Sequence, residues 1–382
     1  MNITMLVLNN FTNDARVHKE ATSLASAGHK VSVVALWQPG LGQVEYQSNY
    51  QVIRLRLLSR TWQNRLLSPP IKYLEFAWRV WQFAGREPAH VYHANDANTL
   101  PAAWLAAKRN QARLVYDAHE LETGRNFLGS HIASVYRAIW SFPEKIFIRK
   151  AQFVITVSRS IANELVRLYN IAMPTLVLNC PETKTVSSSN RLHIELKIPE
   201  DHKIILYQGR ISMGRGIESF IKAIQNIDNV AGVILGEGPA LESFRQRVDS
   251  GEFQRIYLPG NVSLMDLPSY TASSDLGIVL IEDTCLSYRL SLPNKLFEYL
   301  HAGLPVICSD LPEIAQVVRD YQVGELTDPD DPAAIAGNID NILSDPIRYA
   351  QLKANAAKAS EEFNWQNESK KLLMIYTMLN HA

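Results

Sequence analysis

The amino-acid sequence predicts an α/β protein of two Rossmann-like domains, each with a parallel β-sheet covered by helices. Short apolar runs alternate with longer amphipathic stretches along most of the chain, which is the pattern of repeated βαβ units. The chain has 382 residues, more than one hydrophobic core usually serves, and a polar stretch, Pro181 to Asn190, interrupts the alternation. We therefore expect domains at residues 1–180 and 193–362, a linker at 181–192 and a last helix within 363–382.

The composition is that of a globular protein without a preference for nucleic acid. Hydrophobic residues make up 47% of the chain, and 38 Lys and Arg balance 38 Asp and Glu, which argues against general nucleic-acid binding. The cysteines, Cys180, Cys285 and Cys308, are far apart and odd in number, so they predict neither a disulfide framework nor a metal knuckle. No apolar stretch approaches the ~20 residues of a membrane-spanning helix. We expect a cytoplasmic protein.

The first half of the chain contains the elements of one parallel sheet. Strands are expected at residues 3–8, 30–35, 91–92, 113–117, 153–157 and 175–178. Amphipathic helices are expected at residues 16–27, ended by Gly28, and at residues 158–169. A strand, a helix and a strand in succession form a βαβ unit, whose strands are parallel.

The loop after the first strand, residues 9–14, lies at the edge of the predicted sheet where ligands bind. It lacks the G-x-G-x-x-G pattern of a dinucleotide site. Asn13, Asp14 and Arg16 are instead candidates for contact with the hydroxyl groups of a sugar. A turn that caps the following helix is the alternative.

Two further strand ends carry histidines. His93 and Asp96 follow the strand at 91–92, and His119 follows the strand at 113–117. Two histidines at neighbouring strand ends, each with an acid nearby, indicate a functional site at this edge. A purely structural role for either histidine stays open.

Residues 53–86 combine cations with tryptophans. The basic residues are Arg54, Arg56, Arg60, Arg65, Lys72 and Arg79, and the tryptophans are Trp62, Trp78 and Trp81. Glu75 is the acid among them. Cations and indole rings together suit an anionic membrane surface, which predicts a peripheral location on the inner face of the cell membrane. The alternative is a helical hairpin with its tryptophans in the core.

The second half repeats the alternation. Strands are expected at residues 203–208, 233–235, 256–258, 276–280 and 306–308. After the first of them, Gly209 lets a ligand approach the backbone, while Arg210 and Arg215 supply two fixed positive charges next to a helix start. This combination suits a diphosphate.

Two other loops of this half contain glycines at strand ends. Gly236 and Gly238 form a tight turn before a helix, and Gly260 with Asn261 follows the next strand. Asp328-Pro329-Asp330 is interpreted as a turn before a helix rather than as a pair of metal ligands. We expect no metal site.

The stretch from 286 to 310 is a polar loop, a short helix and an apolar strand. Ser291 is a candidate N-cap and Pro293 fits the first turn, so the helix is expected to begin at 292 or 293. Lys295 and Glu298 lie on one face of this helix. The cation could hold a phosphate and the carboxylate a ribose diol; an ordinary surface ion pair is the alternative.

With these pieces in place, the sequence resembles the retaining glycosyltransferases of the GT-B architecture, group 1. The resemblance covers nearly the whole chain and rests on segments in the expected order. They are DARVHKEATSLASAGHKVSVVA, VYHANDANTLPAAWLAA, LVYDAHE, VITVSRSIANEL, VLNCP, GRISMGRGIESFIKAI, LGEGP and PNKLFEYLHAGLPVICSD. It implies two domains that face a central cleft, with a last helix that crosses back to the first domain.

The resemblance also implies roles for single residues. Arg210 matches the arginine that binds the donor diphosphate, and Arg215 stands where a lysine is usual. Glu298 matches the carboxylate that holds the donor ribose, and His119 matches a histidine close to the transferred sugar. The loop of Gly260, Asn261 and Val262 resembles the segment that binds the base.

The implied activity is transfer of a hexose-type sugar from a nucleoside-diphosphate sugar to a glycan or lipid-linked acceptor in cell-surface polysaccharide synthesis. The first domain binds the acceptor and the second the donor, with retention of configuration and without a metal or other cofactor. An epimerase acting on a nucleotide sugar and a non-catalytic partner subunit are the alternatives.

The sequence departs from the family pattern in two places. Leu290 stands where the first of two glutamates is usual, so contacts to the sugar are expected from Tyr288, Ser291 or Asn294. The usual glycine-rich acceptor loop is replaced by residues 9–13.

Overall fold

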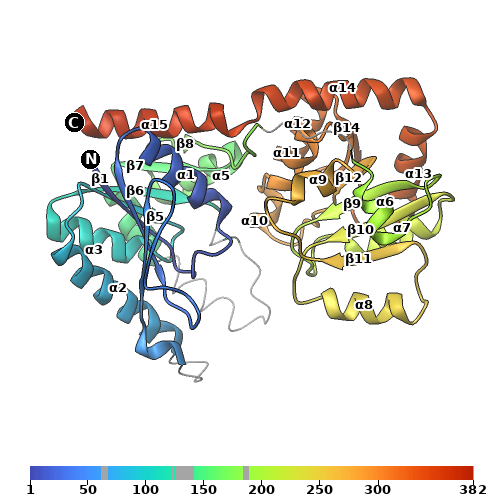
Figure 1. Cartoon of the computed structure of the whole chain (residues 1–382). Helices are drawn as coiled ribbons and strands as arrows, with labels where there is room; N and C mark the ends of the chain where they lie inside the picture. Colours follow the sequence, from blue (N-terminus) through green and yellow to red (C-terminus); the bar gives the residue numbers. More distant parts are fainter. Residues whose placement is uncertain (62–67, 122–123, 125–141, 184–188, 382) are drawn as a thin grey trace. The chain divides into compact units, whose positions relative to one another are not determined.

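The computed structural model describes residues 1–61, 68–121, 124, 142–183 and 189–381. The chain divides into two compact units (Figure 1). Unit 1 comprises Met1–Asn179 together with Glu368–Ala382, and unit 2 comprises Cys180–Asn367. The expected linker at 181–192 begins next to this boundary.

Unit 1 is built on a parallel sheet. Among the described residues this sheet has eight strands in the order β3-β4-β2-β1-β5-β6-β7-β8. Their bounds are β1 Asn2–Leu6, β2 Lys30–Leu36, β3 Val44–Tyr46, β4 Gln51–Leu55, β5 Val91–Asn95, β6 Arg113–Ala118, β7 Phe153–Thr156 and β8 Thr175–Leu176. Only the edge strand β3 runs antiparallel to its neighbour. All five residues of β5 are buried, because helices cover both faces of the sheet.

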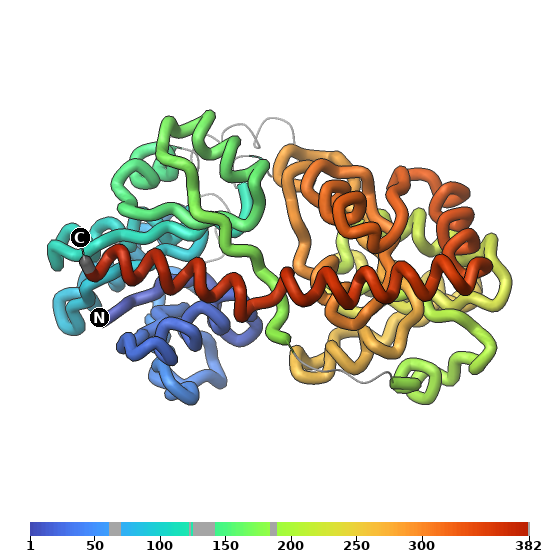
Figure 2. The backbone as a smooth tube through the Cα atoms, turned by 90° about the horizontal axis from the view of Figure 1, so that it is seen from above, coloured from blue at the N-terminus to red at the C-terminus, as the bar shows by residue number. Residues whose placement is uncertain are grey.

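The helices of this unit include its C-terminal segment. They are α1 Ala15–Ser26, α2 Ser68–Arg86, α3 Leu100–Asn110, α5 Arg159–Tyr169 and α15 Trp365–His381, with the 3₁₀ turns η1 Leu58–Thr61 and η3 Ile148–Lys150. Helix α15 lies along unit 1 (Figure 2) and buries Leu372, Ile375, Tyr376 and Leu379. This burial is why residues 365 onward form an amphipathic helix.

Unit 2 contains a second sheet. Among the described residues it has six strands, all parallel, in the order β11-β10-β9-β12-β13-β14. The strands are β9 Lys203–Gln208, β10 Val230–Leu235, β11 Ile256–Gly260, β12 Leu276–Val279, β13 Val306–Ser309 and β14 Gly324–Thr327. The helices are α6 Arg191–Leu196, α7 Ile217–Gln225, α8 Leu241–Asp249, α9 Leu267–Thr271, α10 Leu286–Arg289, α11 Asn294–His301, α12 Pro312–Tyr321, α13 Pro332–Leu343 and α14 Pro346–Glu362. The predicted α/β fold with two parallel sheets is therefore confirmed.

Each sheet has a point at which the strand order reverses. In unit 1 it lies between β1 and β5, and in unit 2 between β9 and β12. Helices leave the sheet in opposite directions at such a point, so the loops that follow the two strands separate and leave room for a ligand. Of the residues that the sequence singled out, these loops contain Asn13, Asp14, Asp96, Gly209, Arg210 and Arg215.

Three local expectations were wrong. Strand β5 continues to Asn95, so His93 lies inside the strand rather than after it. Helix α11 begins at Asn294 with Pro293 as its N-cap. The hydroxyl of Ser291 donates to the carbonyl of Tyr288 (2.7 Å), so this side chain closes the end of α10 and does not cap α11.

Candidate functional site

In unit 2, the loops after β9 and β10 touch through their backbones at two glycines. Gly236 has φ +140°, and a Cβ placed there would lie 1.9 Å from the carbonyl oxygen of Gly209. Gly238 has φ +158°, and its Cβ would lie 2.2 Å from the carbonyl oxygen of Ile211. Both positions therefore require glycine, and the loop that contains Arg210 takes its path from them.

The two predicted arginines lie in different surroundings. Arg210 is exposed, and its backbone is fixed by the Tyr207 hydroxyl, which donates to the Arg210 carbonyl (2.8 Å). The guanidinium carbon of Arg215 lies 4.6 Å from the centroid of the Tyr288 ring. The Nε of Arg215 is buried and has no hydrogen-bond partner. A buried donor without an acceptor is what a bound anion would satisfy.

Lys295 is not part of a surface ion pair, which corrects one alternative. Its side chain is 8% exposed, and its Nζ lies 3.7 Å from the centroid of the Tyr207 ring. Burial lowers the pKa of Lys295 well below its usual range, and the positive charge of Arg215 lowers it further. A Cβ on Gly209 would lie 3.5 Å from Lys295 Cε, so the ammonium lies directly under the loop after β9.

Glu298 lies one turn after Lys295 on α11 and is half-buried. The side-chain amide of Gln208, the last residue of β9, donates to its carboxylate. The two residues are 90 positions apart in the sequence, so periodicity within α11 gave no sign of this contact.

The other predicted residues of this unit surround the same loops. Leu290 is the C-cap of α10, and Asn294, the first residue of α11, is exposed. Gly260 ends β11, and its carbonyl accepts a hydrogen bond from the Gly236 backbone (2.9 Å), which joins the predicted base-binding loop to the glycine turn. Asn261 is exposed and Val262 half-buried.

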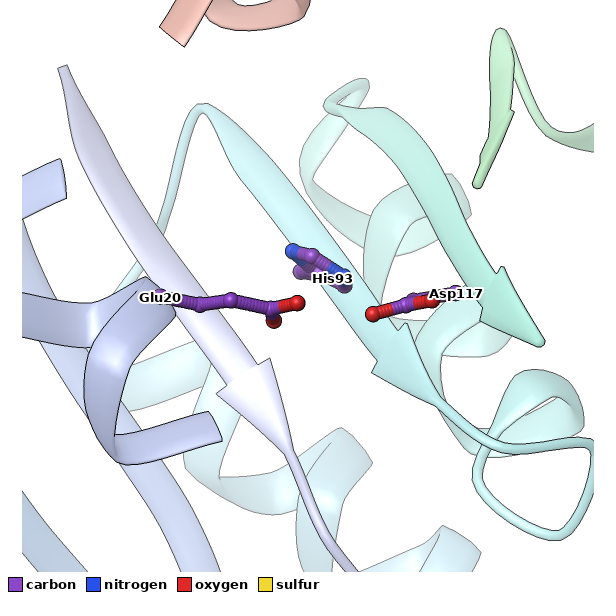
Figure 3. A group of neighbouring side chains, drawn as sticks. All are labelled: Glu20, His93 and Asp117. Atoms are coloured by element: carbon purple, nitrogen blue, oxygen red, sulfur yellow. The ribbon is translucent and has the colours of Figure 1, made fainter. Parts of the chain in front are cut away.

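In unit 1, three buried titratable side chains lie close together. Ligand atoms of Glu20, His93 and Asp117 lie within 4.8 Å of one another (Figure 3). Such a group can hold a metal ion in principle. Here a permanent cation is already present, because Arg16 Nε lies 3.0 Å from Glu20 Oε1 and 2.9 Å from Asp117 Oδ2. The positive charge of Arg16 therefore already lies beside these carboxyl groups, in the place of a metal ion.

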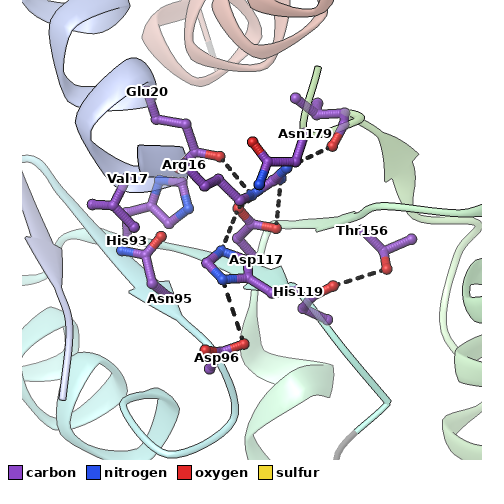
Figure 4. A network of polar contacts seen from close by, with 12 residues as sticks. Arg16, Val17, Glu20, His93, Asn95, Asp96, Asp117, His119, Thr156 and Asn179 are labelled. Atoms are coloured by element: carbon purple, nitrogen blue, oxygen red, sulfur yellow. Dashed lines mark hydrogen bonds and ion pairs between the residues drawn. The ribbon is translucent and has the colours of Figure 1, made fainter. Parts of the chain in front are cut away.

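Arg16 is therefore an internal residue, contrary to its predicted contact with a sugar (Figure 4). Its side chain is 4% exposed; Nη2 donates to Asp117 Oδ1 (3.0 Å) and Nη1 to the carbonyl of Val177 (2.8 Å). Burial raises the pKa of Glu20 well above its usual range, and Asp117 raises it further, whereas the charge of Arg16 opposes the shift. Asp117 keeps its negative charge: burial raises its pKa, but Arg16 and His119 outweigh that effect and lower it.

His119 lies just beyond β6 between two carboxylates. Its Nε2 is 3.1 Å from Asp117 Oδ2, and its Nδ1 is 3.6 Å from Asp96 Oδ1. Burial by itself lowers the pKa of His119, but Asp96 and Asp117 outweigh burial and raise the pKa to about 10. The ring is thus a fixed imidazolium with an 18% exposed side chain, able to offer positive charge to an oxygen-rich ligand.

The remaining candidates of unit 1 have structural partners or lie at the surface. Asp14 caps α1 by accepting from the Val17 backbone (3.2 Å), as the capping alternative predicted, and Asn13 is exposed. His93 is fully buried and pairs through Nδ1 with the Tyr376 hydroxyl of α15 (2.7 Å). Burial lowers the pKa of His93 to about 4, so the ring is neutral. It belongs to the interior rather than to the ligand edge.

The basic and aromatic segment is only partly described, since Trp62 and Arg65 lie outside the described residues. Trp78 and Trp81 of α2 are 51% and 42% exposed, so the core alternative is wrong for these two side chains. Arg54 is buried and pairs with Glu45 (2.7 Å), and it faces the protein rather than solvent. Among the described helices, none combines the length and hydrophobicity that crossing a membrane requires.

Family models match both halves of the chain. Residues 188–359 match the family of glycosyl transferases group 1, and residues 14–180 match the glycosyl transferase 4-like domain. A D-inositol 3-phosphate glycosyltransferase of Xylanimonas cellulosilytica is 25% identical over 75% of this chain and 71% of its own length. An uncharacterized glycosyltransferase of Methanocaldococcus jannaschii is 25% identical over 93% of this chain and 91% of its own length.

Solved structures give the same result for the fold. Sucrose-phosphate synthase from Thermosynechococcus elongatus superposes with a TM-score of 0.84 at 20% identity, over 100% of this chain and 99% of that one. HepE of Anabaena in complex with UDP-glucose gives a TM-score of 0.76 at 17% identity, over 99% and 100%. The chain therefore belongs to the group 1 glycosyltransferases and has the GT-B fold.

Proposed function

We propose that this glycosyltransferase moves a hexose-type sugar from a nucleoside-diphosphate sugar to a hydroxyl group of a glycan or lipid-linked acceptor, with retained configuration, in the synthesis of cell-surface polysaccharide. Unit 2 binds the donor and unit 1 the acceptor. The observation that carries the donor assignment is a group of basic side chains around the loop after β9. Arg215 Nε is buried without a hydrogen-bond partner, and Lys295 is buried beneath Gly209.

These cations suit the charge that develops in the reaction. When the bond between the sugar C1 and the phosphate oxygen breaks, negative charge grows on the leaving diphosphate. Arg210, Arg215 and the first turns of α7 and α11 offer positive charge and N–H groups to it. We propose that they serve in place of a metal ion.

The acceptor step needs no protein nucleophile in this proposal. The acceptor oxygen forms the new bond to C1 on the face that the diphosphate leaves, and the proton of the acceptor hydroxyl passes to the departing phosphate oxygen. His119 contacts the transferred sugar, a role that its fixed imidazolium charge supports. Glu298 accepts hydrogen bonds from the ribose.

Nucleotide binding is the first test. UDP is the first probe, because HepE binds UDP and UDP-glucose; GDP, ADP and CMP follow, each with and without magnesium. We expect one nucleoside diphosphate to raise the melting temperature without magnesium, by mass action. Glu298→Ala should weaken this binding. No shift with any nucleotide would favour a non-catalytic subunit.

Turnover is the second test. With the matching sugar donor and an acceptor, Arg210→Ala should lower kcat on the order of a hundredfold and change nucleotide affinity less, because the arginine acts on charge that grows during the reaction. Arg319→Ala, which removes an exposed arginine paired with Asp310, is the matched control. Release of free nucleotide without any acceptor would instead support the epimerase alternative.

We also propose that unit 1 binds an anionic membrane surface through residues 53–86. Leu74, Trp78 and Trp81 occupy one face of α2 and are all exposed. The guanidinium of Arg109, from α3, lies 3.7 Å from the centroid of the Trp81 ring, so α3 adds a cation to this face. Exposed indoles beside cations suit the head-group region of a membrane.

Vesicle sedimentation tests the membrane proposal. The protein should sediment with vesicles that contain phosphatidylserine, less so as salt increases, and not with purely zwitterionic vesicles. The double change Trp78→Ala with Trp81→Ala should remove most of the binding. Met374→Ala, at an exposed apolar position of α15, is the control. Equal binding by the double variant would refute the proposal.

A further inference from the structure

Gln208 is a buried polar residue that joins the end of β9 to helix α11, two elements of the proposed donor site. It is the last residue of β9 and is 2% exposed. Its backbone N–H donates to the Tyr299 hydroxyl (3.0 Å), and that hydroxyl lies 3.0 Å from the carbonyl of Leu206, to which it donates. The backbone of Gln208 is therefore fixed.

The side-chain amide has two partners that determine its orientation. The carboxylate of Glu298 only accepts hydrogen bonds when ionised, so the NH₂ group of Gln208 must face it. The amide oxygen then faces the hydroxyl of Thr271 at 2.9 Å, and the one proton of this hydroxyl is shared between Gln208 and the carbonyl of Leu267, also at 2.9 Å. Thr271 is 1% exposed and belongs to α9. The three side chains form a buried chain of hydrogen bonds that ends at a half-buried carboxylate.

We propose that Gln208, held by Thr271, is a positioning residue that fixes the Glu298 carboxylate in the orientation in which it accepts the ribose hydroxyls of the donor. This inference rests on the proposed function of Glu298. A long carboxylate side chain loses rotamer freedom when it binds a ligand. Because the Gln208 amide already orders the Glu298 carboxylate in the free protein, less conformational entropy is lost when the ribose binds. More of the energy of the ribose hydrogen bonds then contributes to affinity.

The test compares UDP with 2′,3′-dideoxyuridine diphosphate by calorimetry on the full chain. The wild type should bind UDP tighter by roughly tenfold or more, because hydrogen bonds to a charged group are lost in the analogue. In Gln208→Met, which keeps the length of the side chain but removes the amide, most of this ratio should disappear. A merely structural defect would weaken both ligands equally and leave the ratio unchanged.

Further variants separate the positioning role of Gln208 from poor folding and from the role of Glu298 itself. Thr271→Val, nearly isosteric, should reduce the ratio if Gln208→Met folds poorly, and Thr271→Ser should restore it. Gln246→Met removes an exposed glutamine that bonds Glu242 on α8 and should change nothing. An unchanged ratio in both Gln208→Met and Thr271→Val, with a reduced ratio in Glu298→Gln, overturns the positioning role alone. An unchanged ratio in Glu298→Gln overturns the ribose role itself.

Discussion

The charges around His119 balance one another. Arg16 and His119 are positive, Asp117 and Asp96 are negative, and burial raises the pKa of Glu20, which favours its uncharged form. Buried charges are tolerated only when they are paired in this way. The geometry also explains why His119 remains charged, since both of its ring nitrogens face carboxylates.

This arrangement makes the stability of the protein depend on pH. The pKa of His119 is about 10 in the folded chain and near 6.5 when unfolded. Its contribution is fully present below pH 6.5 and is lost as the pH rises toward 10, because the folded state then gives up a proton that the unfolded state has already lost.

We therefore expect the free energy of unfolding of the wild type to approach that of His119→Gln between pH 6.5 and 10. The change should be on the order of a few kcal/mol. Urea denaturation of both proteins at several pH values measures it, and groups that titrate in both cancel in the difference. If the free energies of unfolding of the two proteins change in parallel over this pH range, Asp96 and Asp117 do not stabilise the charged form of His119.

The sequence predicted some of these residues and not others. His119 and Arg210 follow strands closely, and Arg215 lies in the same loop as Arg210, so local pattern was enough to place them near an edge of the sheet. Gln208 and Glu298 are 90 residues apart, and Thr271 is 63 from Gln208, so their contacts exist only after the sheet forms. His93 was misplaced because the polar residues at the end of β5 concealed the true length of a buried strand.

At the scale of elements, the local sequence pattern predicts which segments form strands and helices. The residues at which these elements end depend on contacts with the segments next to them. Ser291 looks like an N-cap in sequence, yet its hydroxyl bonds to the carbonyl of Tyr288, where α10 has just ended. Helix α11 starts without a side-chain cap. The positions of Gly236 and Gly238 follow from the backbone alone, because their φ values of +140° and +158° are ones that residues with a side chain rarely adopt.

The turn after β10 provides a prediction. Gly236→Ala should destabilise the protein by roughly 3 kcal/mol or more, because its φ is strained for alanine and the new Cβ would meet a backbone carbonyl at 1.9 Å. Gly251→Ala is the control: it has φ +80° with nothing within 4 Å of its Cβ, and should cost about 1 kcal/mol. Urea denaturation measures both. Similar losses would mean that the Gly209 loop moves aside easily.

At the scale of the whole molecule, each unit has its own sheet and its own core. The core of unit 2 includes Ile339 of α13, and Leu372 of α15 is buried in unit 1. Both side chains are fully buried, so truncation to alanine should cost about 2–5 kcal/mol at either place. The division was visible in the sequence as two alternating series, but the return of residues 368–382 to unit 1 rests on contacts far apart in the chain.

Two cores predict two steps of thermal unfolding, because domains usually unfold as separate units. In scanning calorimetry, Leu372→Ala should lower the transition of unit 1 and Ile339→Ala that of unit 2. A nucleoside diphosphate that binds unit 2 should raise only the transition that Ile339→Ala lowers, since a ligand stabilises the unit to which it binds. Met374→Ala should leave both transitions in place, because this side chain is 58% exposed. If every variant and the nucleotide shifted one common transition, the two units would unfold together, and the assignment of the donor to unit 2 would need direct evidence from binding to the Glu298 and Arg215 variants.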